Sequence, residues 1–253
     1  MRSTMVTPGG RPSRYPEPSP RRGPSTVAVR SVASRRWSPR SPTIVGEMSG
    51  AASAFPPYRG KRIFDLVVLA AVAIPAAIIG AGCAIAVRAT SKGPIMFTQE
   101  RVGRDSRPFT VLKFRTMVAG ENPIFPDASR ITSAGRWLRR LSLDELPQLV
   151  NVGRGEMSIV GPRPTLPYQV ERYDEHQRLR LCVRPGLTGL AQVNGRNALS
   201  WATRIEWDIT YVQTQSVRTD LRILLHTITA VVTGRGAEGH PADDPLAAAP
   251  GES

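Results

Sequence analysis

An uncharged run of 22 residues, from Leu66 to Val87, limits what this 253-residue chain can fold into more than any other feature. As a straight helix the run would be about 33 Å long, which is enough to cross the hydrocarbon core of a bilayer. Pro75, near its middle, removes a backbone hydrogen bond and predicts a kink. Basic residues flank both ends, whereas a spanning helix usually carries its excess positive charge on one side. We therefore predict a re-entrant membrane helix over residues 58–92, with a spanning helix and a buried core helix as the alternatives.

The net charge of the chain is +14, which predicts an anionic partner. Half of that charge lies in residues 1–57, where nine arginines and two acids stand among many Pro, Ser and Gly residues. Such a composition cannot bury enough apolar surface to offset chain entropy, and we predict a disordered arm over residues 1–57 and a flexible tail over 237–253. Two cysteines favour a reducing compartment over a disulfide framework, and the three histidines show no zinc-ligand spacing.

The remainder is predicted to be an α+β domain, mostly helical, over residues 93–236. Two short β-rich segments flank a turn-rich stretch and predict a β-hairpin, Ile95–Gln99 with Phe109–Phe114. Pro123 and Pro126 predict a loop at 121–130. The segment Thr132–Leu141 carries Trp and Leu opposite arginines, which is typical of an amphipathic helix at a membrane interface or of ordinary packing. Apolar spacing predicts further helices at Thr165–Cys182, Trp201–Val212 and Leu221–Val232.

Two adjacent carboxylates, Asp144 and Glu145, follow a basic run at Arg136, Arg139 and Arg140. Acids that hold a cation or attack phosphorus, beside bases that hold phosphate, indicate phosphoryl-transfer chemistry. The alternative is structural: Ser142 and Glu145 fit a capping box at a helix N-terminus.

The position of Pro147 allows either Ser142 or Asp144 as the N-cap of this helix. In both cases the two carboxylates lie at the positive helix end, which favours their ionised forms.

Two glycine-containing turns later in the chain each present an arginine. Arg184 opens the first, Arg184–Leu190, and Arg196 lies in the second, Gln192–Asn197. Backbone N–H groups and guanidinium groups in such turns can contact phosphate oxygens, although each turn alone also fits an ordinary loop.

The chain resembles the bacterial sugar transferases known as polyprenyl-phosphate phosphoglycosyl transferases, in their small monotopic subfamily. Within it, the likeness is greatest to the undecaprenyl-phosphate transferases that start N-linked glycan assembly. Seven motifs match in order between residues 59 and 240: Lys61–Asp65, Phe97–Gln99, Lys113–Met117, Leu143–Leu146, Val160–Pro164, Val183–Gly186 and Ala191–Asn197.

The resemblance implies transfer of a sugar-1-phosphate from a UDP-sugar to polyprenyl phosphate, with UMP released, as the first membrane step of glycoconjugate or polysaccharide assembly. It implies that Asp144 is the nucleophile that forms a covalent phosphosugar intermediate, with Glu145 as its partner acid. It also implies a Mg²⁺ ion near Asp144. Arg196 matches a phosphate-holding arginine of the family. Arg163, Arg184, Lys113 and Arg115 lie in matching motifs and are expected to bind phosphate or substrate.

The resemblance places the catalytic domain on the cytoplasmic face of the bacterial inner membrane, with the bilayer as a further partner. Relatives often carry Ser before the membrane-helix proline, where this chain has Ile74. The alternatives are a non-catalytic family member and a basic membrane-surface scaffold or nucleic-acid-binding protein. The ordered part lacks interleaved basic and aromatic residues, so nucleic acid is not expected as a partner. The sequence favours an N-acetylated sugar only through the resemblance, and it predicts no oligomeric state.

Overall fold

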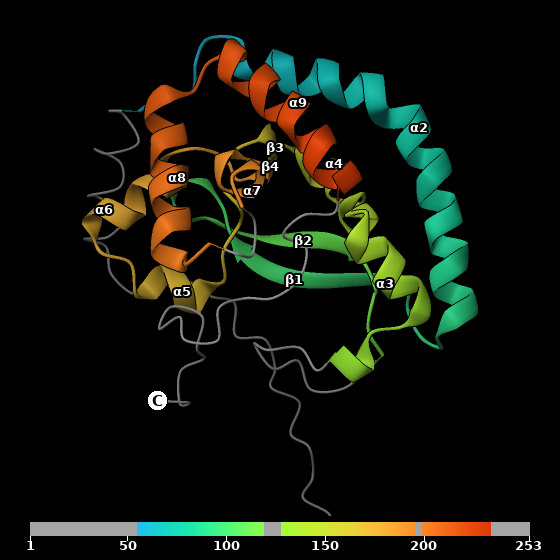
Figure 1. Cartoon of the computed structure of the whole chain (residues 1–253). Coiled ribbons are helices and arrows are strands. Elements are labelled where there is room, and N and C mark those ends of the chain that lie inside the picture. The colour runs from blue at the N-terminus through green and yellow to red at the C-terminus, as the bar shows by residue number, and fades with distance from the viewer. Residues whose placement is uncertain (1–54, 119–127, 196–198, 234–253) are drawn as a thin grey trace, which may run out of the picture. The chain divides into compact units, whose positions relative to one another are not determined.

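The computed structural model describes residues 55–118, 128–195 and 199–233, which form a mostly helical domain with two small sheets (Figure 1). The predicted tail, residues 1–54 of the predicted arm and most of the predicted loop at 121–130 lie outside these residues. The main elements, in chain order, are α2 Lys61–Thr90, β1 Met96–Val102, β2 Pro108–Phe114, α3 Ser133–Arg140, α4 Gln148–Arg154, β3 Ser158–Val160, α5 Pro167–Glu171, α6 Glu175–Arg178, β4 Gly186–Thr188, α7 Leu190–Val193, α8 Trp201–Thr214 and α9 Val217–Thr233.

Helix α2 contains the predicted apolar run and has an unusual distribution of buried residues. Its buried residues, Lys61, Asp65, Cys83 and Val87, lie toward its two ends, whereas the apolar middle is exposed, with Ile74 at 74%. The helix continues through Pro75, and Figure 1 shows that it changes direction along its length. This helix of 30 residues contains an 18-residue stretch with mean hydropathy 2.5, so it is long and apolar enough to cross a membrane. An exposed apolar surface of this length marks a partner other than water.

The predicted hairpin is confirmed. Strands β1 and β2 pair antiparallel from Met96 opposite Phe114 to Val102 opposite Pro108. Asn151 of α4 attaches to the open edge of β2, because its Oδ1 accepts from the Leu112 N–H at 3.2 Å and its Nδ2 donates to the Thr110 carbonyl at 2.8 Å. These two bonds satisfy backbone groups at the strand edge and fix α4 against the hairpin.

A second sheet, which was not predicted, pairs β3 parallel with β4. The backbones approach so closely beside this pair that a Cβ on Gly186 would overlap the main chain of Gly161. Gly186 therefore has no space for a side chain, and the segment Arg184–Leu190, which was predicted as a glycine-containing turn, contains a short strand.

The predicted helix over Thr165–Cys182 is wrong, because the segment forms α5, α6 and a 3-10 turn at Leu179–Cys182. Asp174 accepts from the Gln177 N–H at 2.8 Å and Gln177 returns a contact to the Asp174 N–H, so a capping box starts a new helix inside the expected one. The other predicted helices are confirmed as α3, α8 and α9.

A buried polar network joins the N-terminal end of α2 to β3 and α9. Lys61 Nζ lies 2.6 Å from Asp220 Oδ2 and 3.2 Å from Asp65 Oδ1. Asp65 Oδ1 also accepts from Ser158 Oγ at 2.9 Å and from the Ile159 N–H at 3.1 Å. Both carboxylates are completely buried. The long apolar helix α2 is thus attached to the domain by charged groups near its N-terminal end.

Candidate active site

The two adjacent carboxylates lie in a 3-10 turn, Leu143–Glu145, between α3 and α4. Ser142 precedes the turn in the left-handed conformation, with φ 56°, and its side chain caps nothing. Helix α4 begins at Gln148 with Pro147 as its N-cap, so both predicted N-caps, Ser142 and Asp144, are wrong. The capping explanation of the pair therefore loses its structural basis.

The substitution Ser142→Ala tests this point. A lost N-cap costs about 1 kcal/mol of stability. We expect Ser142→Ala to change the free energy of unfolding by less than about 0.5 kcal/mol, because the Ser142 side chain makes no capping hydrogen bond that the change would remove. Denaturant unfolding of the two proteins measures the difference, and a loss of about 1 kcal/mol or more would restore the capping explanation.

Glu145 is held by two cations. Its Oε1 accepts from Lys113 Nζ of β2 at 2.7 Å and from Arg163 Nη2 at 2.8 Å. Burial alone would raise the pKa of Glu145, but Arg163 and Lys113 more than offset it and hold the pKa well below its usual range. Glu145 is therefore an ionised carboxylate whose orientation is fixed.

Asp144 has a different environment. Among the described residues, none donates a hydrogen bond to its carboxylate. Burial raises the pKa of Asp144, which the cations Lys113, Arg163 and Arg139 lower and the neighbouring charge of Glu145 raises. The expectation that both acids are favoured in the ionised form holds for Glu145 and is wrong for Asp144, because burial has the larger effect there. A poorly solvated acid that receives no hydrogen bond from the described residues is a candidate reactive group.

Positive charge exceeds negative charge around the pair. Lys113, Arg163 and Arg139 all act on Asp144, and Arg101 of β1 acts on Glu145 and on Arg163. Burial and the nearby Arg163 lower the pKa of Arg101 to about 10, whereas Glu145 raises it. Four cations around two carboxylates leave an excess of positive charge at the site, which favours binding of a dianion.

Arg101 is a site residue that lies outside the seven motifs of the sequence. The register puts it on the same face as Lys113, since Arg101 is opposite Phe109 and Lys113 is opposite Phe97. Strand alternation could have indicated this, but the position of Glu145 beside that face depends on a contact between distant parts of the chain.

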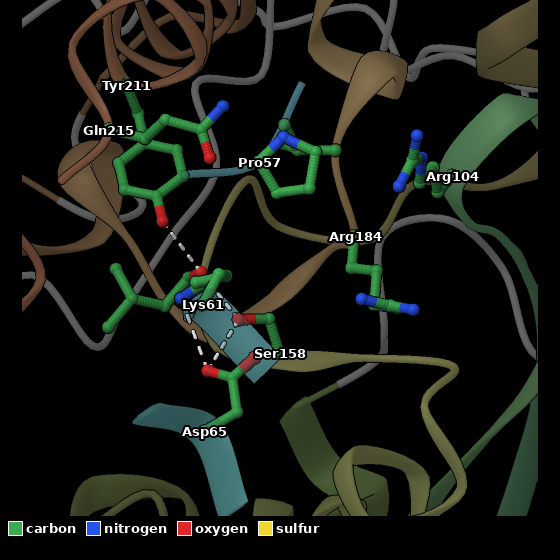
Figure 2. Close-up of a pocket in the computed structure, with 10 residues that line it drawn as sticks. Pro57, Lys61, Asp65, Arg104, Ser158, Arg184, Tyr211 and Gln215 are labelled. Carbon is green, nitrogen blue, oxygen red and sulfur yellow. Dashed lines mark hydrogen bonds and ion pairs between the residues drawn. The ribbon is translucent and has the colours of Figure 1, made fainter. Parts of the chain in front are cut away.

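The other predicted site residues lie in different environments. Arg115 is buried, and its guanidinium donates to the Lys92 and Ser91 carbonyls, each at 2.9 Å, next to the C-terminal end of α2. Figure 2 shows Arg184 and Arg104 at a small pocket beside Lys61 and Asp65, near the base of α2. Arg184 Nε also donates to the Gly155 carbonyl at 2.8 Å. Arg196 lies outside the described residues.

The structure therefore brings together Asp144, Glu145, Lys113 and Arg163, which come from three separate segments of the chain. Among the described residues, no cluster of three or more His, Cys, Asp or Glu residues could hold a metal ion by itself. The site is suited to a phosphorylated ligand that binds to the cations and places its phosphorus near Asp144.

Comparison with known proteins identifies the family. The family model described as bacterial sugar transferase matches residues 57–234, which is more than half of the chain. The chain belongs to the bacterial sugar transferase family. The matched range contains all of the site residues described above, and it begins just before α2.

Several named relatives are similar over most of this range. The uncharacterized sugar transferase EpsL of Bacillus subtilis is 42% identical over 181 residues, which cover 70% of this chain and 90% of EpsL. The exopolysaccharide production protein ExoY of Sinorhizobium fredii is 42% identical over 200 residues, or 70% of this chain and 87% of ExoY. The UDP-glucose:undecaprenyl-phosphate glucose-1-phosphate transferase of Klebsiella pneumoniae is 40% identical over 181 residues, which cover 66% of this chain and 39% of that longer protein.

Proposed function

We propose that this sugar transferase moves a sugar-1-phosphate from a UDP-sugar to a polyprenyl phosphate such as undecaprenyl phosphate, releasing UMP. The observation that carries the proposal is a pair of acids inside a group of four cations: Glu145 is bound by Lys113 and Arg163, whereas no described residue donates a hydrogen bond to Asp144. The names of the Klebsiella relative and of the UDP-galactose-lipid carrier transferase of Erwinia amylovora, which is 39% identical over 200 residues, support the donor and acceptor classes.

In the first half-reaction, the Asp144 carboxylate attacks the phosphorus that bears the sugar. A bond forms between the carboxylate oxygen and phosphorus, the bond to the bridging oxygen breaks, and UMP leaves with the electron pair. Lys113 and Arg163 are positioned to neutralise the negative charge that collects on the phosphate oxygens. In the second half-reaction, the acceptor phosphate oxygen attacks the same phosphorus and frees Asp144.

The site also fits a Mg²⁺ ion. Mg²⁺ is commonly bound through one or two carboxylates together with substrate phosphate oxygens rather than by an all-protein cage. Asp144 would hold it, because Glu145 is already engaged by Lys113 and Arg163. The ion would neutralise diphosphate charge when bound.

We propose further that α2 enters the bilayer from the cytoplasmic face and returns to it. Its exposed apolar middle, its bend and the burial of residues toward both of its ends support this topology. The exposed side chains of α9, Val217, Leu221, Leu225 and Ile228, support contact between α9 and the same membrane surface.

Release of UMP tests the proposed function. The purified protein in detergent or nanodiscs is given undecaprenyl phosphate, Mg²⁺ and one of several donors: UDP-glucose, UDP-galactose and their N-acetylated counterparts. We expect one donor to give acceptor-dependent turnover and the others little. A correctly folded, membrane-bound protein that releases no UMP from any donor would instead support a basic membrane-surface scaffold.

A further inference from the structure

The segment that carries Arg163 is held in place with unusual completeness. Four consecutive carbonyl oxygens, from Pro162 to Thr165, each accept a hydrogen bond from another part of the chain. The donors are the Gly186 N–H at 2.8 Å, Arg180 Nη2 at 3.0 Å, Arg101 Nη1 at 3.3 Å and the Val102 N–H at 2.9 Å, in that order. Pro162 and Pro164 restrict the backbone further. A segment fixed in this way presents its arginine side chain from a defined position.

Arg180 has the most buried of these donor side chains. It is 2% exposed, and its Nη1 donates to the Tyr173 hydroxyl at 2.5 Å. The same Nη2 that donates to the Arg163 carbonyl also donates to Asp208 Oδ2 of α8. Its guanidinium lies over the rings of Tyr173 and Trp201. The Arg180 guanidinium thus links Asp208 of α8 to the backbone of Arg163.

The Arg180–Asp208 pair is poorly suited to stabilising the fold alone. Among the described residues, nothing donates to Asp208 Oδ1, which is buried. Moving two charges out of water costs about as much as their attraction returns, so well-packed apolar residues would serve the core equally well. What apolar residues could not provide is a planar donor that contacts a carbonyl and a carboxylate together.

We propose that Arg180, oriented by Asp208, is a positioning residue for Arg163. It fixes the backbone from which the Arg163 guanidinium reaches Glu145, and so sets where the donor phosphate binds relative to Asp144. Arg180 contacts no substrate and acts only through Arg163. The inference rests on the proposed transferase function.

A double-mutant cycle measures this dependence. Steady-state UMP release is recorded for the full-length wild type, Arg180→Lys, Arg163→Ala and the double variant, with thermal unfolding of each. Arg180→Lys keeps the charge and loses the planar fork. We expect it to lower kcat/KM by about 10- to 100-fold, as a displacement of about 1 Å in a catalytic group would. In the Arg163→Ala background, Arg180→Lys should lower kcat/KM by less than about twofold, because the side chain that Arg180 positions is absent.

Arg204→Lys is the matched control. Arg204 is also buried, lies over the Trp201 ring and donates through Nε to the Leu199 carbonyl at 3.0 Å. We expect its effect on kcat/KM to be the same factor in both backgrounds. Asp208→Asn supplies a second cycle if Arg180→Lys does not fold, and it should show the same dependence on Arg163.

The outcomes separate the two proposals. A wild type that releases no UMP from any donor contradicts the proposed function. An active wild type in which Arg180→Lys, or Asp208→Asn in its place, costs the same factor with and without Arg163 contradicts the positioning role, because the residue then acts through general stability.

Discussion

Asp144→Asn abolishes UMP release and at the same time makes the folded protein more stable at neutral pH. Activity should fall by more than about a thousandfold, because the amide cannot attack phosphorus. Stability should rise because burial penalises the carboxylate, raising its pKa, whereas a neutral amide of the same size avoids that penalty. UMP release and denaturant unfolding of the same preparations measure the two effects.

The stability difference between Asp144→Asn and the wild type should depend on pH in one direction. The pKa of Asp144 is raised in the folded protein, so the unfolded chain loses this proton at a lower pH than the folded one. Protonated Asp144 therefore stabilises the folded wild type fully at a pH below the ordinary Asp pKa. This contribution to the free energy of unfolding is lost as the pH rises through the raised pKa of the folded protein. The stability advantage of Asp144→Asn should therefore be absent in strong acid and appear as pH increases. An advantage that instead grew as pH fell would contradict the buried-acid description.

The raised pKa of Asp144 should also affect the pH dependence of activity. Only the ionised carboxylate attacks, so kcat/KM should fall on the acid side at a pH above the ordinary Asp pKa. Glu145→Gln is a useful comparison, because the pKa of Glu145 is held low and its loss should reduce activity without producing the same gain in stability.

Lys61→Met should be among the most destabilising single substitutions in the described part of the chain. The change leaves Asp65 and Asp220 as two completely buried carboxylates without the ammonium that lies 3.2 and 2.6 Å from them. Breaking a buried ion pair in this way costs about 3–5 kcal/mol. The hydroxyls of Tyr58 and Tyr211 still donate to Asp220, but they do not neutralise it. Denaturant unfolding in a fixed detergent gives the free-energy difference.

Arg59→Met is the matched control for this measurement. Arg59 is exposed and lies two residues away on the same basic flank, so its loss should change the unfolding free energy by less than about 0.5 kcal/mol. Adding Asp220→Asn to Lys61→Met should recover part of the loss, because one uncompensated charge is removed. If Lys61→Met costs no more than Arg59→Met, the buried network does not anchor α2.

Features that depend on neighbouring residues could be predicted from the sequence. The apolar run gave α2, a turn between two β-rich segments gave the hairpin, and apolar spacing gave α8 and α9. Predictions that depended on where a helix begins were weaker. Ser142 resembles an N-cap but takes a left-handed conformation, and the capping box at Asp174 divides a segment whose apolar spacing suggested one helix.

The site illustrates a different limit. Asp144 and Glu145 stand out as an adjacent acidic pair, and the motif resemblance singled out Lys113 and Arg163. The roles of Arg101 and Arg180 depend on contacts across 63 and 17 residues of chain, to carbonyl groups that no sequence pattern identifies. Tertiary contacts also distinguish Glu145, which Lys113 and Arg163 bind, from Asp144, which receives no hydrogen bond from the described residues. Sequence could not separate them, because the two residues are neighbours with similar local sequence.

Intact mass spectrometry of the protein incubated with its UDP-sugar donor and Mg²⁺, without lipid acceptor, tests the central claim most directly. We expect the wild type to gain the mass of one phosphosugar, added undecaprenyl phosphate to remove it, and Asp144→Asn never to acquire it. A wild type that turns over donor with acceptor but shows no covalent adduct, or an adduct that persists in Asp144→Asn, would contradict the assignment of Asp144 as the nucleophile.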